Sequence, residues 1–321
     1  MVVTCYQIKK KVCKKTKLLY GWSKSIGLEL LMKKLTLALL LFVAITKVDA
    51  LPVRNPADAA LYRRGLFFNN ECCVAPDACF SWTDNLSFRL GFSGDYVFDR
   101  KMETDQTPYR PGTLAQTKIY TSAGYIALNY CNCLELFSTL GATRMEWLLI
   151  DPMLSPLFPS QSPTAVFKSG FSWGVGANLI CLQCDYFTVG LEGEYFQTHP
   201  ELSYITLTGI YPTQSSITYH EWQVGAGISS ILCFCDNAIS IVPYLAIKVA
   251  RAKSTQKFVG DLLRFGSPVV FSDIVLPSLR STHWLGYAIG ATFSLREAIG
   301  ITVEGRWVDE TALSVNGTFR F

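Results

Sequence analysis

The stretch Ala312–Phe321, which reads ALSVNGTFRF, alternates apolar and polar side chains up to the last residue of the sequence. The apolar positions are Leu313, Val315, Phe319 and Phe321, and polar residues occupy the positions beside them. A period of two is typical of a β-strand with one apolar and one polar face. An edge strand of a soluble sandwich could show the same pattern, whereas a barrel in a membrane needs every strand paired. The interpretation therefore depends on whether the rest of the chain repeats the pattern.

The same alternation recurs in nine further segments, with apolar side chains on one face and mainly Gly, Ser and Thr on the other. They are residues 86–99, 118–130, 134–147, 167–179, 187–195, 221–229, 239–249, 285–294 and 301–307. The polar face of a soluble sheet tends to be rich in Lys and Glu, whereas small polar residues suit a crowded barrel lumen. We therefore expect an all-β fold, a transmembrane antiparallel β-barrel of the bacterial outer membrane. It would have about ten strands, and up to sixteen if long connections hide further pairs.

Connections between these segments alternate between short and long. The short ones are residues 131–133, 181–184, 233–237 and 296–299, and the long ones are residues 101–116, 148–164, 198–216 and 253–278. Outer-membrane barrels have short periplasmic turns and longer outer loops. Aromatic residues near the strand ends, among them Tyr96, Trp222 and Trp307, would form the girdles found at both membrane interfaces.

An export signal precedes the strands. Lys33 and Lys34 form a short basic region, and the twelve residues Leu35–Thr46 form an apolar run that is too short to span a bilayer. We expect cleavage after Ala50, with a long basic region as the alternative to an upstream extension. The expected organisation is an upstream extension (1–31), a signal peptide (32–50), a Cys-containing periplasmic N-terminal segment (51–80) and the β-barrel (81–321).

Removal of the signal peptide reverses the sign of the net charge. Residues 1–50 hold ten Lys and two acidic residues, so the mature chain has 19 basic and 23 acidic groups. Its net charge is then −4 instead of +4, and the basic balance gives no support to nucleic-acid binding. The 271 mature residues contain no apolar run near 20 residues, so we expect no transmembrane helix.

Charged residues on the polar faces of the predicted strands are the candidates for lining a pore. They are Arg89, Asp95, Asp99, Lys168, Glu192, Glu194, Glu221, Lys248, Glu304, Arg306 and Arg320. Opposite charges across a water-filled bore would set its selectivity. The alternative is that some of them merely pair across neighbouring strands or lie in solvent near the rim.

Nine cysteines of the mature chain fall on one side of the predicted topology. They are Cys72, Cys73, Cys79, Cys131, Cys133, Cys181, Cys184, Cys233 and Cys235. The first three precede the first strand and the others lie in three short turns, which places all nine at the periplasmic rim. Export to an oxidising compartment favours disulfides, and the odd number leaves at least one cysteine free or bonded to another chain. A zinc or redox site at the Cys181–Cys184 pair lacks a second cysteine pair or a βαβ context, so we expect no metal and no cofactor.

An enzyme would need a nucleophile and a base on the barrel wall. The chain has three histidines, His199, His220 and His283, and no GxSxG-type motif. His220 falls on the outward face beside Glu221, where an interfacial histidine is the simpler interpretation. We therefore expect that the chain is not an enzyme.

Five segments resemble the chlamydial major outer membrane porin in the same order. They are LPVRNPADAAL (51–61), GDYVFDR (94–100), TLGAT (139–143), YHEWQ (219–223) and VEGRWVDETALSVNGTFRF (303–321). The resemblance covers nearly the whole mature chain. It implies a trimeric, cysteine-rich porin that is cross-linked by disulfides, conducts broadly with a weak preference for anions, and is a surface antigen. The outer loops are shorter here than in the family, and the family's strand count is higher than ten.

The sequence thus predicts a porin that lets small hydrophilic solutes and ions diffuse through a wet lumen, tied by its rim cysteines into the envelope. Its partners would be outer-membrane lipid, further copies of the chain, disulfide-linked envelope proteins and small solutes. The alternative is a closed structural envelope or adhesin barrel, because side chains can fill a bore of eight to ten strands.

Overall fold

The computed structural model describes ten stretches of the chain. They are residues 51–61, 86–104, 113–148, 164–184, 187–205, 210–212, 215–234, 239–258, 262–264 and 278–320. The predicted upstream extension and signal peptide lie outside the described residues. So do Cys72, Cys73, Cys79, Cys235 and Phe321.

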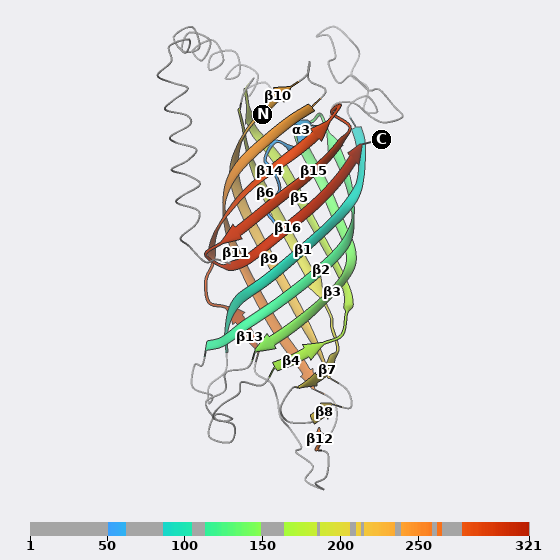
Figure 1. Ribbon diagram of the computed structural model, residues 1–321, viewed down its shortest axis with the longest axis vertical. Coiled ribbons are helices and arrows are strands. Elements are labelled where there is room, and N and C mark those ends of the chain that lie inside the picture. The colour runs from blue at the N-terminus through green and yellow to red at the C-terminus, as the bar shows by residue number, and fades with distance from the viewer. Residues whose placement is uncertain are drawn as a thin grey trace.

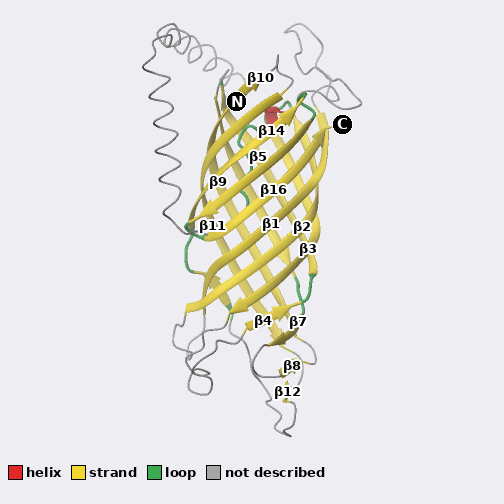
Figure 2. Ribbon diagram, viewed as in Figure 1, coloured by secondary structure: helices red, strands yellow, loops and turns green. Residues whose placement is uncertain are grey.

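Ten long antiparallel strands form a closed barrel (Figures 1 and 2). They are β1 (Leu86–Thr104), β2 (Thr113–Tyr130), β3 (Leu134–Leu148), β5 (Gly170–Gln183), β6 (Phe187–Thr198), β9 (Ser215–Ser230), β11 (Ile239–Phe258), β14 (Leu285–Leu295), β15 (Ile299–Trp307) and β16 (Glu310–Arg320). Each pairs with the next in this order, and β16 returns to pair with β1. The predicted all-β antiparallel barrel and its count of about ten strands are confirmed.

Short elements decorate the two ends. They are β4 (Thr164–Phe167), β7 (Leu202–Ile205), β8 (Ile210–Pro212), β10 (Leu232–Phe234), β12 (Leu262–Arg264), β13 (Leu279–Ser281) and the one-turn helix α3 (Asp58–Leu61). Strand β13 pairs with both β1 and β11, so it joins these two long strands beyond the ends of the shorter β14, β15 and β16. Among the described residues, no helix is long and apolar enough to cross a membrane.

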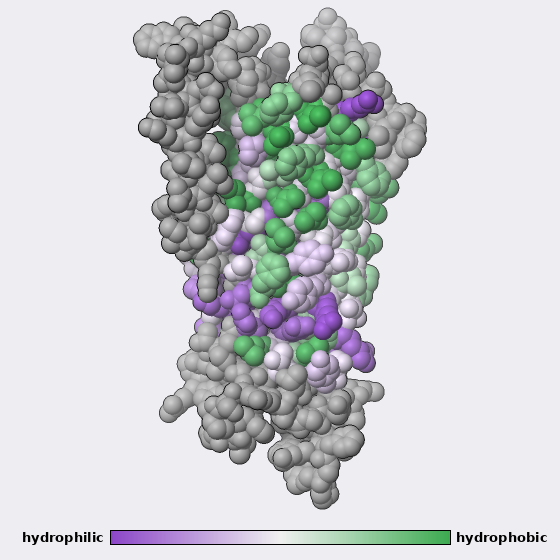
Figure 3. All heavy atoms as spheres, viewed as in Figure 1, coloured by the Kyte–Doolittle hydropathy of each residue, from purple (hydrophilic) through white to green (hydrophobic). Residues whose placement is uncertain are grey.

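The short turns, α3 and the end of β16 lie together at one end of the barrel, the upper end in Figure 1. The short strands β4, β7, β8, β12 and β13 lie at the other end. By the rule for outer-membrane barrels, the first is the periplasmic end and the second the outer end. Strand alternation makes the outer wall apolar, with Phe92, Ile247 and Phe293 about half exposed. Figure 3 shows this apolar band and a hydrophilic belt below it, toward the outer end.

A β-bulge in β1 reverses the alternation near the outer end of that strand. Its register with β16 shifts between Val97 and Asp99, because one extra residue stands on the β1 side. Before the bulge the odd-numbered residues of β1 point inward, and after it Arg100 and Met102 are the buried ones.

Candidate functional site in the barrel lumen

Residues 51–61, which follow the predicted cleavage point, lie inside the barrel. Leu51, Val53 and Ala57 are buried, and α3 packs against β5 at the periplasmic end. Pro52 and Pro56 interrupt the pattern of backbone N–H donors, so the segment is poorly suited to pair as a strand. We expected residues 51–80 in the periplasm. The described part of that segment instead occupies the lumen, as a plug whose deepest residue is Leu51.

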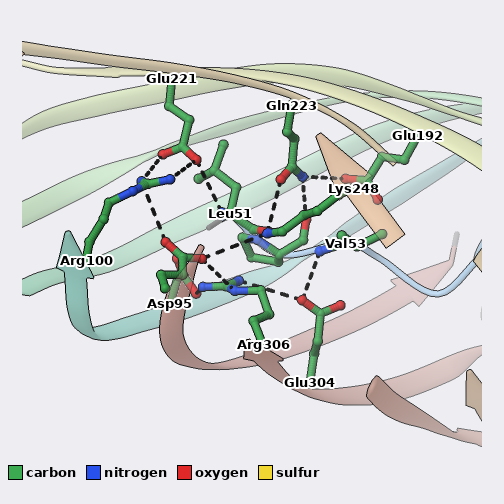
Figure 4. A network of polar contacts seen from close by, with 12 residues as sticks. Leu51, Val53, Asp95, Arg100, Glu192, Glu221, Gln223, Lys248, Glu304 and Arg306 are labelled. Carbon is green, nitrogen blue, oxygen red and sulfur yellow. Dashed lines mark hydrogen bonds and ion pairs between the residues drawn. The ribbon is translucent and has the colours of Figure 1, made fainter. Parts of the chain in front are cut away.

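Side chains of the barrel wall satisfy the backbone of this plug (Figure 4). Its N–H groups donate to three carboxylates: Leu51 N to Glu221 (3.3 Å), Val53 N to Glu304 (2.8 Å) and Arg54 N to Glu192 (2.7 Å). Its carbonyls accept from the wall, since Lys248 Nζ donates to Leu51 O and Gln223 Nε2 donates to Pro52 O (2.8 Å). Buried backbone groups need partners, so these wall residues take the place of water along the segment.

Two plug side chains anchor the segment more specifically. The Arg54 guanidinium stacks on Tyr125 and Phe137, with its carbon 4.2 and 4.0 Å from the ring centroids. The Asn55 amide nitrogen donates to Val242 O and Thr292 Oγ1, and its Oδ1 accepts from Ala57 N and so supports the turn into α3.

The one-turn helix α3 does not span the membrane, and it places the carboxyl of its first residue, Asp58, in the lumen. Burial, together with the nearby Glu135, raises the pKa of this Asp58 carboxyl from 3.8 to about 7, and Arg89 and Arg54 offset part of the rise. Asp58 is therefore easier to bury in its protonated form.

Wall residues also bind the backbone of α3, since Arg89 Nη2 and Asn129 Nδ2 both donate to Ala59 O.

Beyond the tip of the plug, buried arginines and carboxylates form one network (Figure 4). Arg100 binds Glu221 with both Nη atoms, at 2.5 and 2.7 Å, and lies 3.6 Å from Glu310. Arg306 contacts Asp95 at 2.5 Å and Glu310 at 2.8 Å. Because each guanidinium meets two or more carboxylates, the cost of burying these charges is offset locally.

An apolar layer fills the lumen on the outer side of this network. It comprises Val97, Met102, Ile119, Met145, Trp147, Ala165, Phe167, Phe196, Leu202, Ile217, Tyr219, Ala252, Leu279 and Ala312, and the plug tip Leu51 packs against it. The Trp147 and Phe167 rings stack edge to face with centroids 4.8 Å apart. Wall charges such as Lys248 and Glu304 are 1% exposed, so the lumen is filled rather than open in this state.

Most of the predicted lining residues lie in this filled lumen. Buried inside the barrel are Arg89, Asp95, Glu192, Glu194, Glu221, Lys248, Glu304, Arg306 and Arg320. Two lie elsewhere. Asp99 stands at the bulge, is half-buried and pairs in register with Thr311, and Lys168 is exposed between β4 and β5, 3.9 Å from Glu201. The structure thus separates these two from the other nine.

Other lumen residues were not anticipated. Arg100 was missed because strict alternation places Asp99 inward, and the bulge that exchanges them has no signal in the sequence. Arg54 was missed because it precedes the first strand, and Glu310 because the last strand was taken to begin at Ala312. A charged residue flanked by Pro in the mature N-terminal segment, VRNP, was the available hint for Arg54.

Known proteins of one family are similar to this chain. The family model described as Chlamydia major outer membrane protein matches residues 32–116. The major outer membrane porin of Chlamydia psittaci is 26% identical, over 90% of this chain and 100% of that protein. Those of Chlamydia pneumoniae (26%) and of Chlamydia trachomatis serovar L1 (24%) match over the same shares. The chain is thus similar to these major outer membrane porins over most of its length.

The β-barrel and these likenesses place the chain in the bacterial outer membrane, as the sequence predicted. Among solved structures, the outer membrane protease OmpT from Escherichia coli matches with a TM-score of 0.40 at 9% identity, covering 77% of this chain and all of that one. At that level nothing about activity follows from the likeness.

Five cysteines lie in the described residues, all at the end of the barrel assigned to the periplasm. Cys131 and Cys133 stand in the β2–β3 turn, Cys181 and Cys184 at the end of β5, and Cys233 in β10. Cys133, Cys181 and Cys233 are exposed, Cys131 is half-buried and Cys184 is buried. Thiols exposed at one rim are accessible to a neighbouring protein in the periplasm.

Proposed function

We propose that this chain is an outer-membrane porin for small hydrophilic solutes and ions, closed in the state described here. The observation that carries the proposal is a ten-stranded lumen lined by charges of both signs, of which many contact a segment that is not part of the wall. A barrel built only for structure needs no separate segment in its lumen, whereas here such a segment fills the periplasmic half and wall side chains fill the outer half. The names of its relatives, which are those of porins, also favour a channel over an enzyme.

The proposed opening step is withdrawal of residues 51–61 toward the periplasm. Leu51 is the deepest residue and α3 the shallowest, so the segment can leave without passing through the barrel wall. Its hydrogen bonds to Glu192, Glu221 and Glu304 would be exchanged for water. The carboxylates and arginines of the periplasmic half would then face solvent, and conduction also requires the side chains of the apolar layer in the outer half to part and leave a narrow passage.

The rim cysteines support a second part of the proposal, which is disulfide cross-linking to other envelope proteins or to further copies of the chain, in a trimer as the family resemblance implies. Replacing Cys131 and Cys133 by Ser should leave the barrel folded and reduce the high-mass, reducible bands on gels. An unchanged ladder of bands would exclude this turn from cross-linking.

The test of the pore is single-channel conductance in planar bilayers with a salt-gradient reversal potential. The mature chain, residues 51–321, would be compared with a variant that lacks residues 51–61. We expect rare openings for the first and frequent ones of stable size for the second. Charge reversal of Arg89 or Glu192 in the shortened variant should shift the reversal potential. If both chains fold into heat-modifiable barrels and neither conducts, the closed structural barrel is the better assignment.

A further inference from the structure

The outer wall changes from apolar to basic at one level on β11. Its outward side chains run from Leu245 and Ile247 through Val249 to Arg251 and Lys253, and the last two are exposed. A hydrophilic belt at the outer edge of the apolar band is visible on the face of the molecule shown in Figure 3. In an outer-membrane barrel this edge lies at the headgroups of the outer leaflet.

Three basic side chains, Arg251, Lys253 and Arg280, lie close together at this edge of the apolar band. Lys253 on β11 stands directly opposite Arg280 on β13 in the antiparallel register, and both side chains are exposed. Arg251 lies two residues before Lys253 on the same face of the strand, so the side chains of the three are neighbours. Like charges directly opposite each other on a sheet destabilise the pair.

The acidic residue Glu103 lies beside this cluster. Glu103 on β1 accepts from Arg280 Nε at 2.7 Å, and the pair is well exposed. On the other side of β11, Lys253 faces His220 and Arg251 faces Trp222. The mature chain as a whole is acidic, so this positive cluster is a local feature that can attract an anion.

The surroundings of the cluster fit a lipid better than a free ion. Trp284 is 63% exposed next to β11, where its carbonyl accepts from Ala250 N, and Trp222 is 43% exposed. Indole rings favour the boundary between headgroups and acyl chains. On their periplasmic side, Val224 and Val249 stand directly opposite each other and continue the apolar wall. A ligand with phosphate at the level of Arg251 and acyl chains along the apolar band matches both features.

We infer that Arg251, Lys253 and Arg280 form a binding site for the phosphate of an anionic lipid in the outer leaflet, of the lipid A class. Arg251 and Lys253 contact the phosphate oxygens, Arg280 is shared between the phosphate and Glu103, and Trp222 and Trp284 flank the sugar and upper acyl chains. The inference rests on the outer-membrane location and not on pore activity.

The test measures binding of bisphosphorylated lipid A to the detergent-solubilised mature chain by native mass spectrometry. The variant is Arg251→Gln/Lys253→Gln, and the matched control is Lys118→Gln/Lys168→Gln. The control removes the same charge from outward positions where Lys118 stands opposite Glu146 and Lys168 lies near Glu201. We expect affinity at least about tenfold weaker in the variant and within about twofold of the parent in the control.

Further arms separate the possible ligands and keep the result interpretable. Arg251→Lys/Lys253→Arg keeps both charges and should retain binding, and heat-modifiable migration reports that each barrel is folded. Dephosphorylated lipid A should bind weakly to all the variants. Equal loss in variant and control, or equal binding of dephosphorylated lipid A, would overturn the site. Full displacement of lipid A by millimolar inorganic phosphate would overturn its assignment to a lipid.

Discussion

The two halves of the lumen are filled by different means. The periplasmic half is polar, and a separate segment, residues 51–61, occupies it through hydrogen bonds to wall carboxylates. The outer half is apolar, and the strands fill it with their own side chains, such as Met145 and Trp147. A segment held by polar contacts can exchange them for water, whereas an apolar layer has no such substitute. On the proposed function, the periplasmic half opens by releasing its segment, and the outer half remains the narrowest part of the bore.

The largest effect is expected where the two halves meet, at Arg100. Arg100→Met leaves Glu221 and Glu310 buried without this partner and should destabilise the barrel by about 3–5 kcal/mol. The measurement is the guanidinium midpoint for loss of the heat-modifiable band. Lys101→Met, one residue along and exposed on the opposite face, is the matched control and should change stability by less than about 0.5 kcal/mol. Similar midpoints for the two variants would refute the network as a source of stability.

The next effect concerns the apolar half. Met145 is fully buried, so Met145→Ala should cost about 2–5 kcal/mol through lost burial and a cavity. Leu136→Ala changes a residue on the outward face of the same strand, where lipid fills the space, and should cost less. In the variant lacking residues 51–61, Met145→Ser should also raise single-channel conductance by widening the apolar layer. An unchanged conductance would place the narrowest point elsewhere.

The sequence predicted the strands of the barrel wall better than the residues that fill the lumen. Alternation requires only local information, so ten strands were found from segments such as 86–99 and 312–321. The bulge beside Asp99 depends on how β1 pairs with β16, which lies more than 200 residues away, and alternation alone gave the wrong phase for Arg100. The position of the plug in the lumen could not be predicted for a related reason. Residues 51–61 have no strand period, and their partners are side chains scattered over the chain from Arg89 to Glu304.

A pH dependence would sharpen the comparison, because the titratable group Asp58 belongs to the plug. Asp58 has an ordinary pKa of 3.8 and one of about 7 when docked. Docking is therefore strongest below pH 4, weakens as the pH rises toward 7, and levels off above that value. Amide exchange of residues 51–61, corrected for intrinsic rates, should show at least about tenfold less protection at pH 8 than at pH 5. Asp58→Asn should flatten this difference, and a full pH dependence in that variant would exclude Asp58 as its source.

The smallest effect is expected at Lys168, the predicted lining residue that lies outside the lumen. It pairs with Glu201 at 3.9 Å, and both side chains are largely exposed, so solvent screens the interaction to within about 0.5 kcal/mol. Lys168→Glu should therefore leave both the unfolding midpoint and the reversal potential of the shortened variant unchanged. Arg89→Glu in the same background should shift the reversal potential, because Arg89 is buried in the lumen against Glu135. A shift at Lys168 equal to that at Arg89 would show that selectivity is set at the outer rim and not among the charges that the plug covers.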